Sequence, residues 1–319
     1  MNDIIKKQAY SEENNTVIAN NSVEKLNYWI QKFNSNGDTA YIKEGQIKKG
    51  TAKRRCFSLT DFSDTIVKYC QISEPSEISN TFLTGIAAYF KLALGKKSFY
   101  IGAANFKANG DFEKYIPVQV SAEGESNFSN CRKLIEDSYN EAVQHSDFSE
   151  EKMTEIIYDN FKLDALYDVT FGCFTSAWNI EFAEIKENIC ISLQKNNDCY
   201  EMVYYYKEEL FSDEEIEFFN SHLLILVADG IQNSDKLISE LEMISEEEYD
   251  LLLNKFNDSA AVYPCEKTVV EFFEEKAEKY SDRIAVVYGN EKLTYREFNN
   301  KVNVCLLYTS PSPRDGLLS

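Results

Sequence analysis

Two histidines are the side chains of this 319-residue chain best suited to acid–base chemistry, because an imidazole titrates near neutral pH. His145 lies in EAVQHSDFSEE, at the end of a helical pattern, and is predicted either to cap that helix or to serve as a general base. His222 lies inside an amphipathic helical pattern and is predicted to be a packing or surface residue. No Gly-x-Ser-x-Gly motif accompanies either histidine, so a hydrolase triad has no support.

Other reactive residue types lack the spacing that their chemistry requires. The cysteines form no C-x-x-C pair, so neither a zinc cage nor a thioredoxin-like redox site is predicted, and they are expected to be buried small hydrophobes. These are Cys56, Cys70, Cys131, Cys173, Cys190, Cys199, Cys265 and Cys305. The stretch LGKKS resembles the end of a phosphate loop, but Phe90 stands where that loop requires a glycine, so Gly95 is predicted to end a helix. The tyrosines of YEMVYYYK are expected to be sheet core rather than a stacking platform.

Composition narrows the class of protein. The chain has 33 basic and 53 acidic residues, a net charge of −20, which disfavours nucleic acid and anionic membrane surfaces as partners. No apolar run reaches the roughly 20 residues of a spanning helix, and the first residues lack the apolar core of a secretion signal. With 44% hydrophobic residues the chain is expected to fold, and a cytoplasmic location is predicted.

The elements that must position these residues alternate between helix and strand, which predicts one α/β lobe to about residue 240. Its predicted helices are 22–33, 63–70, 79–94 and one from about residue 128, with Cys131, Leu134, Ile135 and Tyr139 on one side. The predicted strands are 56–61, 98–106, 115–120, 168–174, 188–194 and 200–207, and residues 43–53 are expected to form a loop.

Four capping boxes predict helix starts in the last third of the chain, because a Ser or Thr and a Glu three residues later satisfy each other's backbone N–H groups. The pairs are Ser212 with Glu215, Ser245 with Glu248, Thr268 with Glu271, and Thr294 with Glu297. Two short strands are predicted around Gly289-Asn290, followed by a helix that is expected to stop at Val304.

The text from ELEMISEEEYDLLLNKFNDSAAVYP through TVVEFFEEKAEKYSDRIAVVYGNEKLTYREFNNKVN resembles the junction between a condensation and an adenylation domain in a nonribosomal peptide synthetase. LTYREFN matches the first core motif of the adenylation domain, which places family-motif positions at Leu293, Thr294, Tyr295 and Glu297. Upstream, residues 21–240 resemble the second half of a condensation domain. There HSDFSEE occupies the place of the His-Gln-Asp-aromatic-Pro-Phe-Glu stretch, with His145, Asp147 and Phe148 at family-motif positions.

The resemblance implies a mixed α/β (α+β) fold: a chloramphenicol-acetyltransferase-like condensation-domain lobe, followed by the first helix and β-hairpin of an adenylate-forming domain. The implied divisions are 1–20, a connector from a missing first lobe; 21–240, the lobe; 241–264, a linker; and 265–303, the start of the adenylation domain. Residues 304–319 are expected to be the translation of a sequencing adapter, since the codons of such an adapter encode CLLYTSPSPRD; a natural disordered tail is the alternative.

The family's His-His-x-x-x-Asp-Gly motif is absent, since the chain has no adjacent histidines. No catalytic, cofactor-binding or metal-binding residue is therefore predicted here, and the chain itself is expected to be inactive in condensation and adenylation. The parent protein would join carrier-bound acyl groups through an amide and activate an amino acid, with ATP, Mg and phosphopantetheine as cofactors. Its expected partners are peptidyl carrier domains, the first condensation lobe and the rest of the adenylation domain. Two alternatives stay open: a non-catalytic carrier-docking module, and a stand-alone acyltransferase that uses His145.

Overall fold

The protein is described by a computed structural model for residues 27–33, 51–108, 110–122, 124–148, 153, 167–175, 187–196, 199–258 and 266–309. Its chain contacts divide it into two units, Met1–Asp250 and Leu251–Ser319, and each is described by itself.

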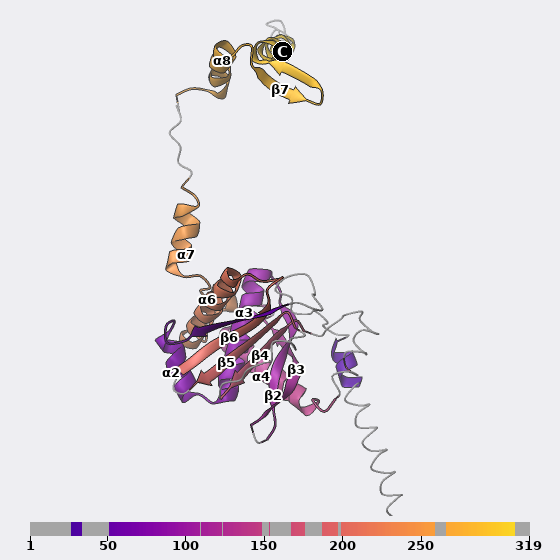
Figure 1. The fold of residues 1–319 in the computed structure, drawn as a ribbon, viewed down its shortest axis with the longest axis vertical. Helices are drawn as coiled ribbons and strands as arrows, with labels where there is room; N and C mark the ends of the chain where they lie inside the picture. The colour runs from indigo at the N-terminus through magenta and orange to yellow at the C-terminus, as the bar shows by residue number, and fades with distance from the viewer. Residues whose placement is uncertain are drawn as a thin grey trace, which may run out of the picture. The chain divides into compact units, whose positions relative to one another are not determined.

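Six strands of the first unit form one mixed sheet in the order β1-β6-β5-β4-β2-β3 (Figure 1). They are β1 Ala52–Ser58, β2 Ser98–Phe106, β3 Phe112–Ser121, β4 Val169–Phe174, β5 Ile189–Asn196 and β6 Cys199–Lys207. The β2–β4 and β4–β5 pairs are parallel, and the other three pairs are antiparallel. Every residue of β4 is buried, as expected for a parallel strand at the centre of a sheet.

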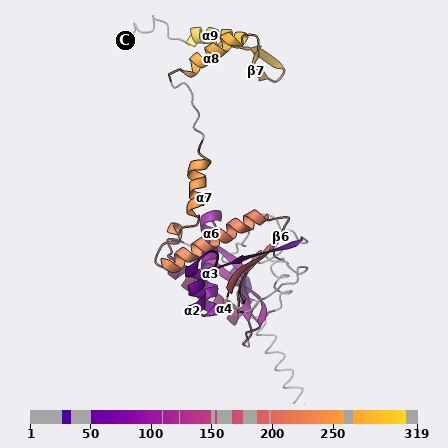
Figure 2. The ribbon, with the colours of Figure 1, turned by 60° about the vertical axis from the view of Figure 1, so that its left-hand side comes forward.

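Four helices cover one face of this sheet (Figure 2): α2 Asp64–Ile72, α3 Pro75–Leu94, α4 Phe128–Gln144 and α6 Asp213–Gln232. α3 is the most buried of them, and it packs against both α4 and α6. A side chain at Gly85 of α3 would place its Cβ only 2.4 Å from Val227 of α6, so the glycine allows the two helices to approach closely. Gly95 ends α3 with a φ of 68°, which confirms its predicted role as a helix terminator.

The tyrosines of β6 lie in the protein core, as predicted. Tyr204 and Tyr206 belong to the large hydrophobic cluster that includes residues of the covering helices, and the Tyr204 hydroxyl donates to the Asn220 side chain of α6 over 2.9 Å. Tyr205 lies in a separate cluster with Cys190 and Val203, because successive strand residues point to opposite faces. Both faces of the sheet are therefore buried at β6.

Several boundaries and faces differ from the predictions. β1 begins at Ala52, so the loop predicted over residues 43–53 extends too far; an edge strand tolerates a charged residue such as Lys53. α3 begins at Pro75, since proline suits the first position of a helix. Leu134 is 54% exposed and does not belong to the buried side of α4.

The cysteine prediction is confirmed for Cys70, Cys131, Cys173 and Cys190 and is wrong for Cys56, Cys199 and Cys305, which are exposed; Cys265 lies outside the described residues.

The second unit contains a π-helical turn η3 Leu251–Lys255, helix α8 Val269–Lys279, a hairpin of β7 Ile284–Tyr288 and β8 Glu291–Thr294, and helix α9 Tyr295–Thr309. The hairpin turns at Gly289, whose φ of 59° suits glycine, as the sequence predicted. Phe273 of α8 contacts Tyr295 and Phe298 of α9, with ring centroids 6.1 and 5.5 Å apart. α9 continues past Val304, where the sequence pattern predicted its end.

Three of the four capping boxes form completely: those of α6, α8 and α9. The fourth forms only in part. Glu248 donates its backbone N–H to Ser245, but its carboxylate contacts His222 instead of closing the box. In the described residues no helix is long and apolar enough to cross a membrane.

Candidate functional site

His145 occupies the C-cap of α4, as one of its two predicted roles required. Its backbone N–H reaches the carbonyl of Ala142, and its own carbonyl accepts a 3.0 Å hydrogen bond from the indole N–H of Trp29. The His145 ring stacks on Tyr28, with centroids 3.8 Å apart and planes 9° from parallel. Residues 27–33 form the helix that carries both aromatic partners, so a contact between distant parts of the chain fixes this imidazole.

A charged pair lies beside the stacked rings. Lys32 forms an ion pair with Glu141 of α4, and its ammonium lies 5.7 Å from the Tyr28 ring centroid. Partial burial raises the pKa of Tyr28, and its hydrogen bond to Glu141 raises that pKa further. Burial works against ionisation of Glu141, yet the hydrogen bonds from Lys32 and Tyr28 hold its pKa below the usual value. The ion pair between Lys32 and Glu141 therefore joins the 27–33 helix to α4.

Phe148, the last family-motif residue of this stretch, continues the same aromatic group. Its ring packs edge-on against Trp29 at 5.8 Å, and Lys114 of β3 lies 4.5 Å from its centroid. The same Lys114 ammonium donates to the Phe148 carbonyl over 3.0 Å. Asp147 between them is exposed. The structure thus brings His145 and Phe148 into one aromatic group. Both residues contact the 27–33 helix, His145 through Tyr28 and Trp29 and Phe148 through Trp29.

The surroundings of the His145 imidazole do not resemble those of an activated general base. A catalytic imidazole is usually oriented by a hydrogen bond from one ring nitrogen to a third group. In the described part of the chain, the buried Nδ1 of His145 has no hydrogen-bond partner. One face of the ring is covered by Tyr28. The contacts of His145 therefore serve to end α4 and to hold the 27–33 helix.

The second group of family-motif residues begins helix α9. Thr294 and Glu297 form its capping box, in which each backbone N–H is satisfied by the other side chain over 2.9 and 3.3 Å. The hydrogen bonds from the Thr294 backbone and hydroxyl hold the pKa of Glu297 below its usual value. Tyr295 packs on Phe273, and Leu293 pairs with Val286 within the hairpin. Each of these residues has a structural task, and the described residues contain no group of three His, Cys, Asp or Glu placed to hold a metal ion.

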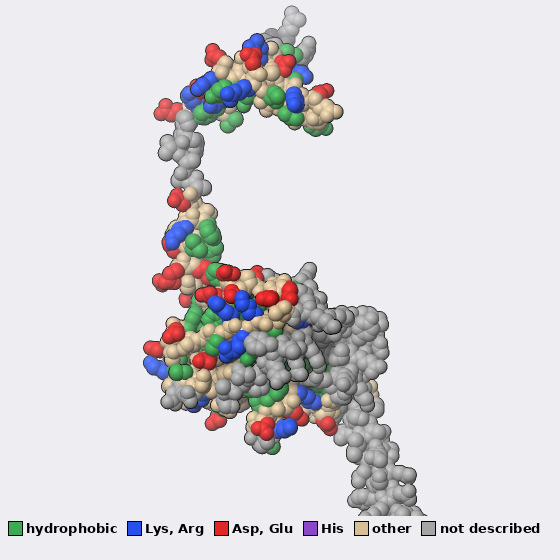
Figure 3. Space-filling model, in the orientation of Figure 1, with side chains coloured by type: hydrophobic (Ala, Val, Ile, Leu, Met, Phe, Trp, Pro, Cys, Tyr) green, Lys and Arg blue, Asp and Glu red, His purple; other side chains and the backbone are tan. Residues whose placement is uncertain are grey.

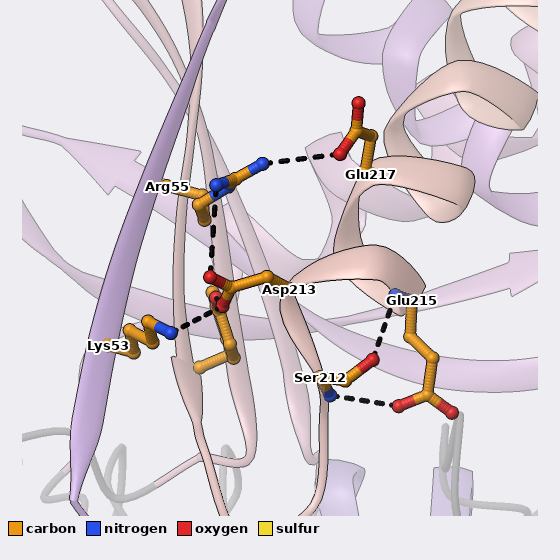
Figure 4. Close-up of polar contacts among 7 residues, drawn as sticks. Lys53, Arg55, Ser212, Asp213, Glu215 and Glu217 are labelled. Carbon is orange, nitrogen blue, oxygen red and sulfur yellow. Dashed lines mark hydrogen bonds and ion pairs between the residues drawn. The ribbon is translucent and has the colours of Figure 1, made fainter.

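Sequence reasoning missed a charged cluster that joins edge strand β1 to the start of α6 (Figure 4). Lys53 lies 2.7 Å from Asp213, and Arg55 spans Asp213 at 3.8 Å and Glu217 at 3.3 Å. The Tyr206 hydroxyl also donates to Asp213. Hydrogen bonds from Lys53 and Tyr206 lower the pKa of Asp213. Two features of the sequence could have revealed this cluster. Lys53 and Arg55 alternate along a strand, and the first turn of the capped helix α6 is acidic.

Comparisons with known proteins agree with the resemblance seen in the sequence. No protein-family profile matches the chain. Bacitracin synthase 2 of Bacillus licheniformis is 26% identical over 209 residues, which are 61% of this chain and 8% of that protein. Gramicidin S synthase 2 of Aneurinibacillus migulanus is 39% identical over 98 residues, 31% of this chain and 2% of that protein.

Solved structures show the fold. The first condensation domain of the calcium-dependent antibiotic synthetase superposes with a TM-score of 0.58 at 10% identity, over 70% of this chain and 54% of that one. The X-domain in complex with OxyB, from teicoplanin biosynthesis, gives a TM-score of 0.56 at 12% identity, over 71% and 56% of the two chains. The chain spans about half the length of these solved chains and a small share of its sequence relatives. It is related in sequence to nonribosomal peptide synthetases and has the mixed α/β, chloramphenicol-acetyltransferase-like fold of their condensation domains.

Proposed function

We propose that this chain is the second lobe of a condensation domain, with a linker and the start of an adenylation domain, from a cytoplasmic nonribosomal peptide synthetase. The whole protein would join carrier-bound aminoacyl or peptidyl groups through an amide and activate an amino acid with ATP. The lobe supplies structure and docking surface, and the catalytic histidine comes from the first lobe. The observation that carries the proposal is the use of His145 as a helix cap, stacked on Tyr28 within a condensation-domain fold.

The cofactors of the whole protein would bind elsewhere. Nucleotide phosphates are commonly held by a glycine-rich turn, and Gly289, the only glycine of residues 266–309, occupies the hairpin turn between β7 and β8. Residues 266–309 therefore offer no glycine-rich turn for ATP. Phosphopantetheine would arrive on peptidyl carrier domains, which are the partners that this proposal implies.

The purified chain is expected to form no amide product. The test supplies one carrier protein loaded with a donor aminoacyl group and one with an acceptor, and measures transfer by mass spectrometry of the intact carriers. Wild type and His145→Ala should both leave the acceptor unchanged, because no oriented base is present; such a base typically contributes about 10²–10⁴-fold to a rate. A complete condensation domain with the His-His-x-x-x-Asp-Gly motif is the positive control.

An amide product that forms with wild type and disappears with His145→Ala would overturn the proposal in favour of a stand-alone acyltransferase. Sequencing the source DNA across both ends of the frame tests the same proposal independently. The frame should continue upstream into the His-His-x-x-x-Asp-Gly lobe and downstream into a glycine-rich ATP loop. An adapter origin of residues 304–319 predicts that natural DNA departs from the present sequence there.

A second candidate function is a non-catalytic docking module. The structural neighbour from teicoplanin biosynthesis is an X-domain solved in complex with another protein, OxyB, which favours this candidate. Such a role needs no base, so the structural tasks of His145 and Phe148 are compatible with it. A pull-down with phosphopantetheinylated carrier protein should enrich this chain, and equal recovery on beads without the carrier would count against docking.

A further inference from the structure

Helix α7 Glu246–Asp250 and the π-helical turn that follows it lack the features that usually stabilise a helix. α7 has five residues, none of them buried, and no residue of η3 is buried either. An isolated helix shorter than about 12 residues is marginal in water. Exposed apolar side chains follow at Leu252, Leu253 and Phe256. Residues 246–258 are called the exit segment below, and its start, α7, must therefore be held by contacts with the rest of the first unit.

Acidic and hydrophobic side chains both cover the surface of the α7 region (Figure 3). Among the acidic ones, Glu248 differs from its neighbours because it is half-buried while Glu246 and Glu247 are exposed. Its carboxylate lies 2.8 Å from Nε2 of His222, in the middle of α6. The side chains of His222 and Glu248 are only 14% and 21% exposed, so solvent screens this contact less than an ordinary surface pair.

Two observations indicate that this contact is specific. Glu248 occupies the capping-box position after Ser245, where its carboxylate would normally accept from the Ser245 backbone, yet it turns to His222 instead. The His222 ring is held in place by Tyr89 of α3 and Phe218 of α6, with centroids 6.3 and 6.2 Å away. The Glu248 carboxylate thus makes a tertiary contact with α6 in place of the local capping hydrogen bond from the Ser245 backbone.

We propose that His222 and Glu248 form a clamp that holds the start of the exit segment on the first unit and controls whether that segment stays helical. While the clamp is closed, Glu248 anchors α7, and the Ser245 hydroxyl caps the Glu248 N–H. When it opens, a short helix without buried residues has too little support and frays. His222 is thus a positioning residue for α7.

Hydrogen exchange of backbone amides in the full chain tests the clamp. His222→Ala and Glu248→Ala should each speed exchange in residues 246–255 by about three- to tenfold, the range expected for losing a partly shielded hydrogen bond to a carboxylate. Exchange in α3 and in the middle of α6 should not change. The double variant should exchange no faster than either single variant, because both remove the same contact. Glu247→Ala is the matched control, since Glu247 is an exposed neighbour on the same helix.

Cleavage by trypsin after Lys255 gives a second readout, which should accelerate in the same variants and stay unchanged in Glu247→Ala. His222→Gln, which can still donate to Glu248, should restore most of the protection. Should His222→Ala disturb the packing of α6, Glu248→Ala still decides the question, because that side chain lies outside the core. Unchanged exchange and cleavage in Glu248→Ala, or additive effects in the double variant, would overturn the proposal.

Discussion

Replacing Trp29 with alanine should lower the free energy of unfolding of the first unit by about 3–5 kcal/mol, the usual range for truncating a large buried aromatic residue. Trp29 is 1% exposed and stacks on Phe33 at 5.6 Å. Its indole N–H also satisfies the carbonyl of His145 at the end of α4. The variant thus loses buried area and leaves that helix end without its donor. Urea unfolding followed by circular dichroism measures the loss.

Two controls separate packing from the hydrogen bond in this experiment. Trp29→Phe keeps an aromatic ring but removes the indole donor, so it should lose less stability than Trp29→Ala. Leu134→Ala alters a helix residue that is 54% exposed and should change stability by no more than about 0.5 kcal/mol. If Trp29→Ala matched Leu134→Ala, the 27–33 helix would not be a fixed part of the first unit, and the account of His145 as its anchor would fail.

Replacing Asp229 with alanine should cost roughly 2–4 kcal/mol, since it leaves a cation and a backbone N–H without their shared partner. The Asp229 carboxylate accepts from Asn233 over 2.7 Å, and from Lys236 and the Glu242 backbone over 2.8 Å each. It is 9% exposed at the end of α6. These bonds tie the segment after α6, including η2 Ile238–Glu240, back onto the helix. Unfolding in urea at pH 7 measures the loss.

The loss of stability caused by Asp229→Ala should depend on pH, and its direction follows from the pKa of Asp229. Burial works against ionisation of Asp229, but the bonds from Lys236, the Glu242 N–H and Asn233 hold its pKa below the usual value. A depressed folded pKa contributes stability above the unfolded value of about 3.9, and this contribution disappears as pH falls through the folded pKa. The gap between wild type and Asp229→Ala should therefore narrow below about pH 4. The exposed Asp235→Ala is the matched control, and a gap independent of pH would contradict the assignment.

Local patterns predicted most of the helices and strands correctly, because the signals that specify them lie within a few residues. β2 has the bounds 98–106 that its apolar run predicted, and α4 begins at Phe128 as expected. Predictions of which side chains of a helix or strand are buried were less accurate. The helical period placed Leu134 beside Ile135, yet only Ile135 is buried. A periodic pattern shows which residues form the apolar face of a helix. How much of that face is buried depends on the neighbouring elements that pack against it.

For the candidate site, the sequence by itself determined that a helical pattern ends near His145, that no adjacent histidines exist, and that the chain resembles a peptide synthetase. These follow from residue identity and spacing alone. Only the tertiary structure decided what each group contacts: Tyr28 stacked on His145, Lys53 and Arg55 paired with the first turn of α6, and Glu248 turned from its cap toward His222. Those partners lie 26 to 162 residues apart in the chain, so no local pattern could specify them. They form because packing of the helices on the sheet brings their charges and rings within a few ångströms.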